Sequence, residues 1–363
     1  MAVDQPVRVV VVGCGAVSQN VYVPVLQVLE RTGEVAVAGL VDPGARQRAE
    51  VAKSFPQAAQ YDDLAPCPLD ARTLAIIATP PRFHAPQSIH ALRQGAAVLC
   101  EKPMAASVAD AEAMLAAARE TNGVLAVGIF RRFFPSFEAL RAVFDQKPFG
   151  ELRRFSIQEG GKFGWGAASD SFFRRDMTMG GVFYDVGVYV VDLLLWLMGE
   201  PLDFTYEDDA MGGVEANCRL EMTYPHGVRG TVRLSRDWQT RNRYDFHFER
   251  GTVTWRAGQA NNLHLTLDGV PFALDGELAA VAAGPGGTAI ETPTRTNLQS
   301  FTVQVRNVLA AMRGEEALRV PGEEGVRSLR FIAACYAART LMDMPWLTAE
   351  ERGAAEALAG GRA

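Results

Sequence analysis

The run Val7 to Val12 constrains the fold most, because it consists of valines apart from Arg8 and leads directly into glycines. A short β-branched segment of this kind is typical of a strand buried on both faces of a parallel sheet. After Gly13-Cys14-Gly15, a helix-compatible stretch runs from Val17 to Arg31, and a second apolar strand follows at Val35 to Val41. The order strand, glycine turn, helix and strand predicts a right-handed βαβ unit.

Strands and helices go on alternating to about residue 128. We expect helices at Ala45–Ser54, Ala85–Gln94 and Val108–Thr121, and strands at Leu74–Ala78, Val98–Cys100 and Leu125–Gly128. Repeated βα units pack as a doubly wound parallel sheet with helices on both faces. The pattern therefore predicts an α/β fold whose N-terminal domain, residues 1–128, is a Rossmann domain.

Residues 129–345 have a different sequence pattern. Their longer segments of alternating polarity are typical of an antiparallel sheet that has one solvated face. We expect an α+β domain with a large, mostly antiparallel open sheet, its strands connected as a meander. Its expected strands are Glu151–Glu159, Glu215–Tyr224, Val228–Ser235, Tyr244–Phe248, Thr252–Trp255 and Leu263–Leu267, and its expected helices are Phe183–Leu197, Leu298–Met312 and Glu324–Met342. We expect a loop at Gly276–Thr288 and a C-terminal tail at 346–363, which is frayed at Gly353–Ala363.

Composition excludes several classes of partner. The 36 basic and 42 acidic residues are scattered along the chain and give a net charge of −6, which argues against nucleic acid. The most apolar later stretch, Val186 to Met198, is interrupted by Asp192 and is shorter than the ~20 residues that span a bilayer, so we expect no membrane association.

The cysteines and the N-terminus point to a reducing compartment. The five cysteines have no paired spacing, so neither disulfides nor a metal site is expected. The first residues lack the basic segment and apolar core of a signal peptide. We therefore expect a cytoplasmic protein.

The glycine turn indicates a dinucleotide site. In Gly13-Cys14-Gly15-Ala16-Val17-Ser18, the first glycine permits a tight turn, and the second lets a pyrophosphate approach the backbone at a helix N-terminus. Serine replaces the third glycine of the usual motif but is still small enough for close packing. A plain strand-turn-helix is the alternative, which the strand before, the helix after and Asp42 make less favoured.

Asp42, at the end of the second strand, bears on the choice of cofactor. Its carboxylate can accept hydrogen bonds from both adenine-ribose hydroxyls, and its charge would repel a 2′-phosphate, which favours NAD(H). Arg46 could offset that repulsion, so NADP(H) stays open. The alternative role for Asp42 is to N-cap the following helix.

Two further strand ends carry polar residues. Thr79 and Pro80 follow the third strand and are expected to wall the cofactor cleft, whereas His84 either contacts the cofactor or is a structural histidine in a turn. Glu101-Lys102-Pro103 follows the strand ending at Cys100. A lysine fixed there by a proline, through a peptide bond that we expect to be cis, is well placed to aid proton transfer to a carbonyl.

The segment after Gly180-Gly181 places three polar residues on one stripe. In a helix, Asp185, Tyr189 and Asp192 stand at i, i+4 and i+7, within a narrow arc of an otherwise apolar surface. Polar groups in such a position need a partner or a cleft. The alternative is helix capping by Asp185 and a core position for Tyr189.

Other polar or aromatic residues of the second half are candidates for binding a hydroxylated substrate, although each alone is more readily explained as a surface or scaffold residue. They are Arg131, Arg132, Lys162, Trp165, Arg174, Arg175 and Asp176.

These motifs, in this order over residues 7–345, resemble those of the glucose-fructose oxidoreductase/inositol dehydrogenase (Gfo/Idh/MocA) family. Val127-Gly128 and Arg132-Phe133-x-Pro135 belong to the same resemblance. It implies an NAD(P)-dependent sugar oxidoreductase that associates through its open sheet as a dimer or tetramer. It also implies that Glu101 and Lys102 lie at the cofactor, with Lys102 beside the nicotinamide.

Tyr189 departs from the commonest family pattern, in which histidine stands at this place. Tyrosine resembles the glucose-fructose oxidoreductase branch and the deoxysugar ketoreductases. A phenol, with an ordinary pKa of ~10, is a better acid than base at neutral pH and suits proton donation to a ketone. We expect Lys102 and Tyr189 to be catalytic and Asp185 to orient the substrate or Lys102. An oxidising dehydrogenase, a sugar-sugar oxidoreductase that retains its cofactor, and a non-catalytic nucleotide sensor are the alternatives.

Overall fold

The computed structural model describes residues 5–164, 173–174, 177–267, 280–284 and 287–360. The chain forms two compact units. The first contains the described residues of 1–130, 165–179 and 297–330, and the second contains those of 131–164, 180–296 and 331–363. The predicted domains are continuous stretches of the chain that end at residues 128 and 345. Each observed unit instead combines three stretches that are separated in the sequence.

The first unit contains a six-stranded parallel sheet in the order β3-β2-β1-β4-β5-β6. Its strands are β1 (Val7–Val12), β2 (Val35–Val41), β3 (Ala59–Tyr61), β4 (Thr73–Ile77), β5 (Ala97–Cys100) and β6 (Leu125–Val127). The predicted Rossmann sheet is confirmed, and β1 and β2 have the predicted bounds. The edge strand β3 was not predicted, because it is short and none of its residues is buried.

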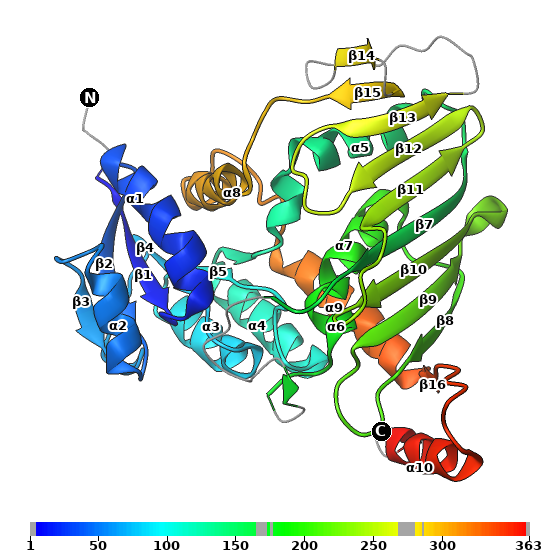
Figure 1. The fold of residues 1–363 in the computed structure, drawn as a ribbon. Helices are drawn as coiled ribbons and strands as arrows, with labels where there is room; N and C mark the ends of the chain where they lie inside the picture. The colour runs from blue at the N-terminus through cyan, green and yellow to red at the C-terminus, as the bar shows by residue number, and fades with distance from the viewer. Residues whose placement is uncertain (1–4, 165–172, 175–176, 268–279, 285–286, 361–363) are drawn as a thin grey trace. The chain divides into compact units, whose positions relative to one another are not determined.

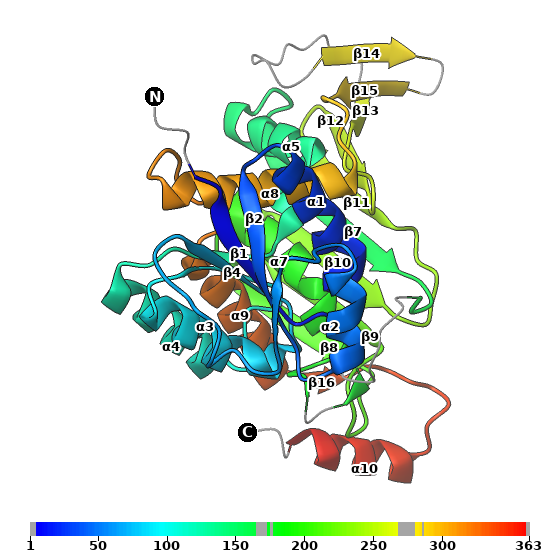
Figure 2. The same ribbon diagram turned by 90° about the vertical axis from the view of Figure 1, so that its left-hand side faces the viewer.

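Helices cover both faces of this sheet (Figure 2). They are α1 (Val23–Arg31), α2 (Ala45–Ala52), α3 (His84–Arg93), α4 (Val108–Thr121) and α8 (Asn297–Met312). The predicted helix at Val17–Arg31 divides into a π-helical turn, Ser18–Tyr22, and α1.

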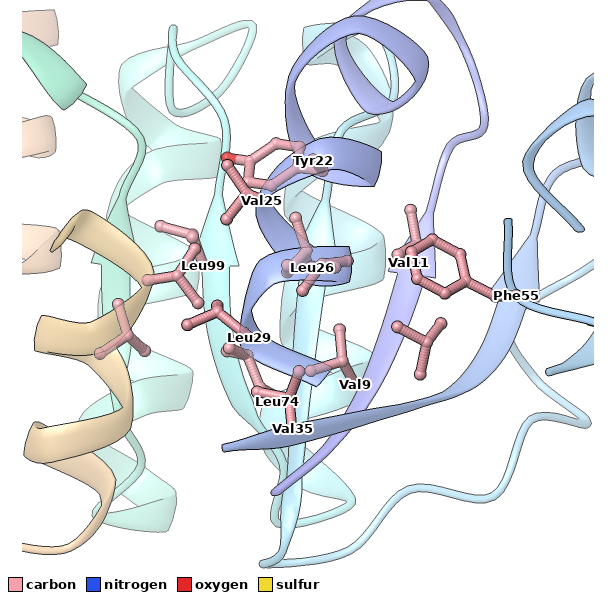
Figure 3. Close-up of a cluster of buried hydrophobic side chains, with 14 of the residues drawn as sticks. Val9, Val11, Tyr22, Val25, Leu26, Leu29, Val35, Phe55, Leu74 and Leu99 are labelled. Carbon is pink, nitrogen blue, oxygen red and sulfur yellow. The ribbon is translucent and has the colours of Figure 1, made fainter. Parts of the chain in front are cut away.

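One apolar core joins α1 and α8 to the sheet. Val9 and Leu74 from the strands pack with Leu26 from α1 (Figure 3). Val308 from α8 belongs to the same cluster, and all four side chains are almost fully buried. At roughly 25 cal/mol per Å² of apolar surface, such burial dominates the stability of the unit. Because α8 lies far along the chain, this core closes only after most of the chain is present.

The second unit contains a ten-stranded sheet in the order β14-β15-β13-β12-β11-β7-β10-β9-β8-β16 (Figure 1). Its strands are β7 (Leu152–Gly160), β8 (Asp203–Asp208), β9 (Asn217–Thr223), β10 (Arg229–Ser235), β11 (Arg243–Phe248), β12 (Gly251–Arg256), β13 (Leu263–Leu267), β14 (Ala280–Gly284), β15 (Gly287–Glu291) and β16 (Thr340–Leu341). Most pairs are antiparallel, as predicted. The predicted meander is wrong, because β7 lies between β11 and β10 and pairs with β10 in parallel.

The remaining helices are α5 (Pro135–Gln146), α6 (Val182–Asp185), α7 (Gly187–Met198), α9 (Gly322–Ala337) and α10 (Ala349–Gly360). The predicted frayed tail is wrong, since α10 occupies most of it. The predicted loop at Gly276–Thr288 is also wrong in part, because β14 and the start of β15 lie within it. No helix in the described ranges combines the length and the apolarity needed to cross a membrane.

Candidate functional site

The two glycines after β1 have different surroundings. Gly13 has a φ of +92°, and a Cβ there would lie 2.7 Å from the carbonyl carbon of Ala78, so only glycine fits. A Cβ on Gly15 would meet nothing within 4 Å. The chain thus turns tightly at Gly13 and leaves open space over Gly15, which fits the pyrophosphate of a dinucleotide. Cys14 is buried, whereas Ala16 and Val17 are half-buried at the start of the helical segment.

Asp42 connects this loop to the end of β2. Its Oδ2 accepts the backbone N–H of Cys14 at 2.8 Å, and its Oδ1 accepts that of Gly44 at 2.7 Å. The capping alternative for Asp42 is wrong, because Gly44 is the residue that precedes α2. Each carboxylate oxygen still has a lone pair for a ribose hydroxyl.

Replacing Asp42 by alanine should weaken NAD(H) binding more than NADP(H) binding, because it removes both a ribose acceptor and a charge that repels a 2′-phosphate. Fluorescence titration of the two cofactors gives the ratio of their Kd values. Asp42→Asn helps to separate the effects, since it removes the charge and keeps one of the two acceptor oxygens that bind the loop. An unchanged ratio in both variants would refute the ribose assignment.

His84 is buried in the first unit and contacts two of its loops. It is 1% exposed, with Nδ1 3.0 Å from the carbonyl oxygen of Pro103 and Nε2 2.7 Å from that of Thr79. Burial lowers its pKa. Of the two roles expected for His84, the structure favours the structural one, in which the ring connects the end of β4 to the turn after Lys102. Thr79 and Pro80 are half-buried, and the Thr79 hydroxyl donates to Gln87 at 2.6 Å.

Glu101 fixes the backbone that carries Lys102. Its carboxylate accepts the phenol of Tyr22 at 2.7 Å and the backbone N–H of Lys102 at 3.0 Å. Burial raises the pKa of Glu101, and the hydrogen bond from Tyr22 partly offsets this rise. The Lys102-Pro103 peptide bond is cis, as predicted. Lys102 itself is half-buried.

Lys102 and the glycine loop lie at the carboxyl ends of strands in the parallel sheet, and we call this side of the sheet its carboxyl edge. The loop follows β1, Thr79 follows β4 and Lys102 follows β5, and these three strands are neighbours. The sheet order reverses direction between β1 and β4. Ligands of open α/β sheets bind outside the carboxyl ends of the strands at such a reversal, so the first unit presents a dinucleotide site with a lysine beside it.

Asp185 is held in the second unit by Arg236. The guanidinium donates to Asp185 Oδ2 and to the carbonyl oxygen of Gly181, each at 3.1 Å. The side chain of Arg236 is 7% exposed and that of Asp185 is 15% exposed. Asp185 therefore has a fixed orientation and remains partly accessible.

The start of this helical segment rests on a second buried carboxyl group. Glu215 Oε1 accepts the N–H groups of Gly181 at 2.8 Å and Phe183 at 3.0 Å, and the phenol of Tyr336 at 2.7 Å. Burial raises the pKa of Glu215. Gly181 must be glycine, because its Cβ would lie 1.9 Å from the Glu215 carbonyl oxygen.

Arg132 does not line an accessible surface, contrary to the expected substrate contact. Its Nε and Nη2 donate to Asp192 at 2.5 and 2.9 Å, and the two side chains are only 4% and 2% exposed. The guanidinium also lies over the Trp196 ring at 4.4 Å. The pair joins α7 to the segment before α5, so both residues have a structural role.

Replacing Asp192 by alanine should destabilise the protein by about 3–5 kcal/mol, because it leaves Arg132 buried without its counter-charge. Thermal unfolding of the variant tests this. Glu151→Ala is the control, since Glu151 forms an exposed ion pair with Lys147 and its loss should leave Tm nearly unchanged. Equal Tm values for the two variants would show that the buried pair is not needed.

Tyr189 is half-buried on α7, and the guanidinium carbon of Arg131 lies 4.4 Å from the centroid of its ring. Of the remaining substrate candidates, Lys162 and Arg174 are exposed. The Arg174 carbonyl oxygen accepts the N–H of Met177 at 2.9 Å. Trp165 and Asp176 lie outside the described residues, as does Arg175. Among the described residues, no cluster of His, Cys, Asp and Glu side chains could hold a metal ion, and all five cysteines are buried thiols.

Comparison with known proteins covers both units. Residues 7–129 match the model of an oxidoreductase family with an NAD-binding Rossmann fold, and residues 137–254 match the GFO/IDH/MocA C-terminal domain. The chain belongs to the GFO/IDH/MocA family. Trans-1,2-dihydrobenzene-1,2-diol dehydrogenase of Bos taurus is 30% identical over 242 residues, which are 64% of this chain and 69% of that protein.

Other relatives match over shorter stretches. The Mus musculus trans-1,2-dihydrobenzene-1,2-diol dehydrogenase is 34% identical over 45% of this chain, a match that spans 48% of its own length. D-glucoside 3-dehydrogenase of Escherichia coli (strain K12) is 28% identical over 54% of this chain and 56% of its own. A levoglucosan dehydrogenase solved with NADH and levoglucosan shares the fold, with a TM-score of 0.77, 16% identity and coverage of 92% and 97%.

Several contacts in this GFO/IDH/MocA family member were not predicted. Three side-chain hydrogen bonds join residues that are far apart in the chain: Tyr22 to Glu101, Arg236 to Asp185 and Arg131 to Glu159. Sequence periodicity predicts which face of an element is buried but not which distant residue meets it. The one available signal is the rule that a buried charge has a partner, which predicts that partners exist without naming them.

Proposed function

We propose that this protein is an NAD(P)-dependent oxidoreductase that transfers hydride between nicotinamide and a carbinol or ketone carbon of a sugar, cyclitol or sugar derivative. NAD(H) is the favoured cofactor because of Asp42. The observation that carries the proposal is the common carboxyl edge of the glycine loop and Lys102, at the point where the strand order reverses. The relatives named as dehydrogenases of diols and glucosides support the substrate class.

The side chains divide the work on the substrate oxygen. Lys102 polarises this oxygen as a cation, and Tyr189 transfers the proton to or from it. Asp185, fixed by Arg236, accepts hydrogen bonds from substrate hydroxyls or orients Lys102. Glu101 and Tyr22 hold the Lys102 backbone in place.

We favour ketone reduction, because a protonated phenol at neutral pH is ready to donate. The oxidising direction is the alternative, and the names of the relatives as dehydrogenases favour it. Product analysis after removal of tightly bound cofactor separates these directions from a sugar-sugar exchange in which the cofactor never leaves.

A screen of keto-sugars with NADH and of polyols with NAD⁺ tests the proposal through the absorbance of the nicotinamide. We expect a change with at least one class of compound and saturable binding of one cofactor. Saturable binding without turnover on any compound would favour the nucleotide-sensing alternative. Absence of binding by either dinucleotide would contradict the proposal itself.

We propose further that the protein acts in the cytoplasm as a homo-oligomer, a dimer or a tetramer. The feature that supports association is the open ten-stranded sheet of the second unit, through which the resemblance implies that the copies meet. Light scattering of the purified protein measures the mass of the assembly, and a mass of 39.4 kDa at all concentrations would indicate a monomer.

A further inference from the structure

Arg131 stacks on the residue that we propose as the proton-transfer group. Besides its 4.4 Å approach to the Tyr189 ring, its guanidinium carbon lies 5.6 Å from the centroid of Trp255 on β12. A guanidinium over an aromatic face is attracted by the negative charge of that face, and it also limits how far the ring can tilt. Arg131 therefore restricts the orientation of Tyr189 within the second unit.

Arg131 is itself held rigidly. It donates to both oxygens of Glu159 on β7, at 2.6 and 2.8 Å, and the phenol of Tyr244 on β11 donates to Glu159 at 2.6 Å. The side chains of Arg131 and Glu159 are 12% and 15% exposed. Burial alone would lower the pKa of Arg131, but the charge of Glu159 more than offsets this and the pKa is raised. The guanidinium is thus a permanent and fixed cation.

We infer that Arg131 is a positioning residue for Tyr189, which orients the ring and stabilises the ionised phenol. Within the second unit, Glu159 on β7 and Tyr244 on β11 are ionisable groups that contact Arg131 directly. On the helical segment of Tyr189 itself, Asp185 is bound by Arg236 and Asp192 by Arg132. Arg131 is the cation that these contacts place directly over the ring.

The inference rests on the proposed function only for its effect on turnover. A cation at this distance favours the charged form of an acid, by about one pH unit or more. Loss of Arg131 should therefore move the ionisation of Tyr189 to higher pH. In a plot of turnover against pH, the part of the curve that follows the ionisation of Tyr189 should shift to higher pH. The same shift is expected whether the reaction runs as a reduction or as an oxidation.

NMR of protein labelled with ¹³C at tyrosine Cζ measures this ionisation directly, with Tyr189→Phe identifying the signal. In Arg131→Gln, the midpoint should rise by about one pH unit or more. In the double variant Arg131→Gln with Glu159→Gln, the rise should be smaller, because the repulsion from Glu159 is removed as well. Arg154→Gln, which removes an exposed arginine of β7, should leave the midpoint unchanged.

A midpoint that stays at the wild-type value in folded Arg131→Gln would overturn the inference. If that variant does not fold, the double variant decides, and an unshifted midpoint there has the same meaning. Because the measurement needs no substrate, its outcome is independent of the proposed function. A shifted midpoint together with full turnover of Tyr189→Phe would leave the inference standing and remove Tyr189 from the mechanism.

Discussion

Replacing Lys102 by methionine is expected to lower kcat/KM by roughly 10³–10⁴-fold, the largest loss from any single side chain. Methionine retains an unbranched side chain but lacks the terminal ammonium and cannot polarise a substrate oxygen. The backbone should not move, because Glu101 binds it through the N–H of residue 102. The measurement is steady-state kinetics at saturating cofactor, on the best compound from the substrate screen.

Cofactor affinity serves as the internal control for this variant. The glycine loop and Asp42 are intact in Lys102→Met, so the Kd of NAD(H) should change little. Lys53→Met removes an exposed lysine that pairs with Glu50, and it should retain full activity. Wild-type turnover of Lys102→Met would remove this lysine from the chemistry.

Tyr189→Phe is expected to lower turnover by the roughly 10²–10⁴-fold that is typical of losing a general acid or base. Fold and cofactor affinity should be retained, because the phenylalanine ring can still pack under Arg131. Tyr189→His should recover part of the activity, since imidazole can carry the same proton at neutral pH. Near-normal turnover of Tyr189→Phe would return Tyr189 to a packing role.

The sequence predicted the first unit well, because its strands and helices follow local rules. The valine run and the glycine turn each act within a few residues, and α4 begins at Val108 as predicted, where the Ser107 side chain accepts the N–H of Asp110. The strand order of the second sheet, in contrast, does not follow from local sequence. Placing β7 between β10 and β11 depends on long-range pairing, for which no local pattern gives a register.

The candidate site shows the same division. Gly13, Gly15 and Lys102 were predicted from motifs whose spacing sets their geometry, and the structure places all three at the carboxyl edge of the sheet. Arg132 was expected to meet substrate, because sequence cannot distinguish an accessible arginine from one buried against a distant carboxylate such as Asp192. The role of such an arginine depends on which carboxylate it meets, and only the tertiary structure determines that carboxylate.

A double-mutant cycle of Lys102→Met and Tyr189→Phe tests most directly whether the two residues act as one unit on the substrate oxygen. The quantity is kcat/KM at saturating cofactor for the wild type, both single variants and the double variant. If they share one proton-transfer step, the loss in the double variant will be clearly smaller than the product of the single losses. Full additivity of the two free-energy changes would mean that Lys102 and Tyr189 act separately and would contradict the shared mechanism.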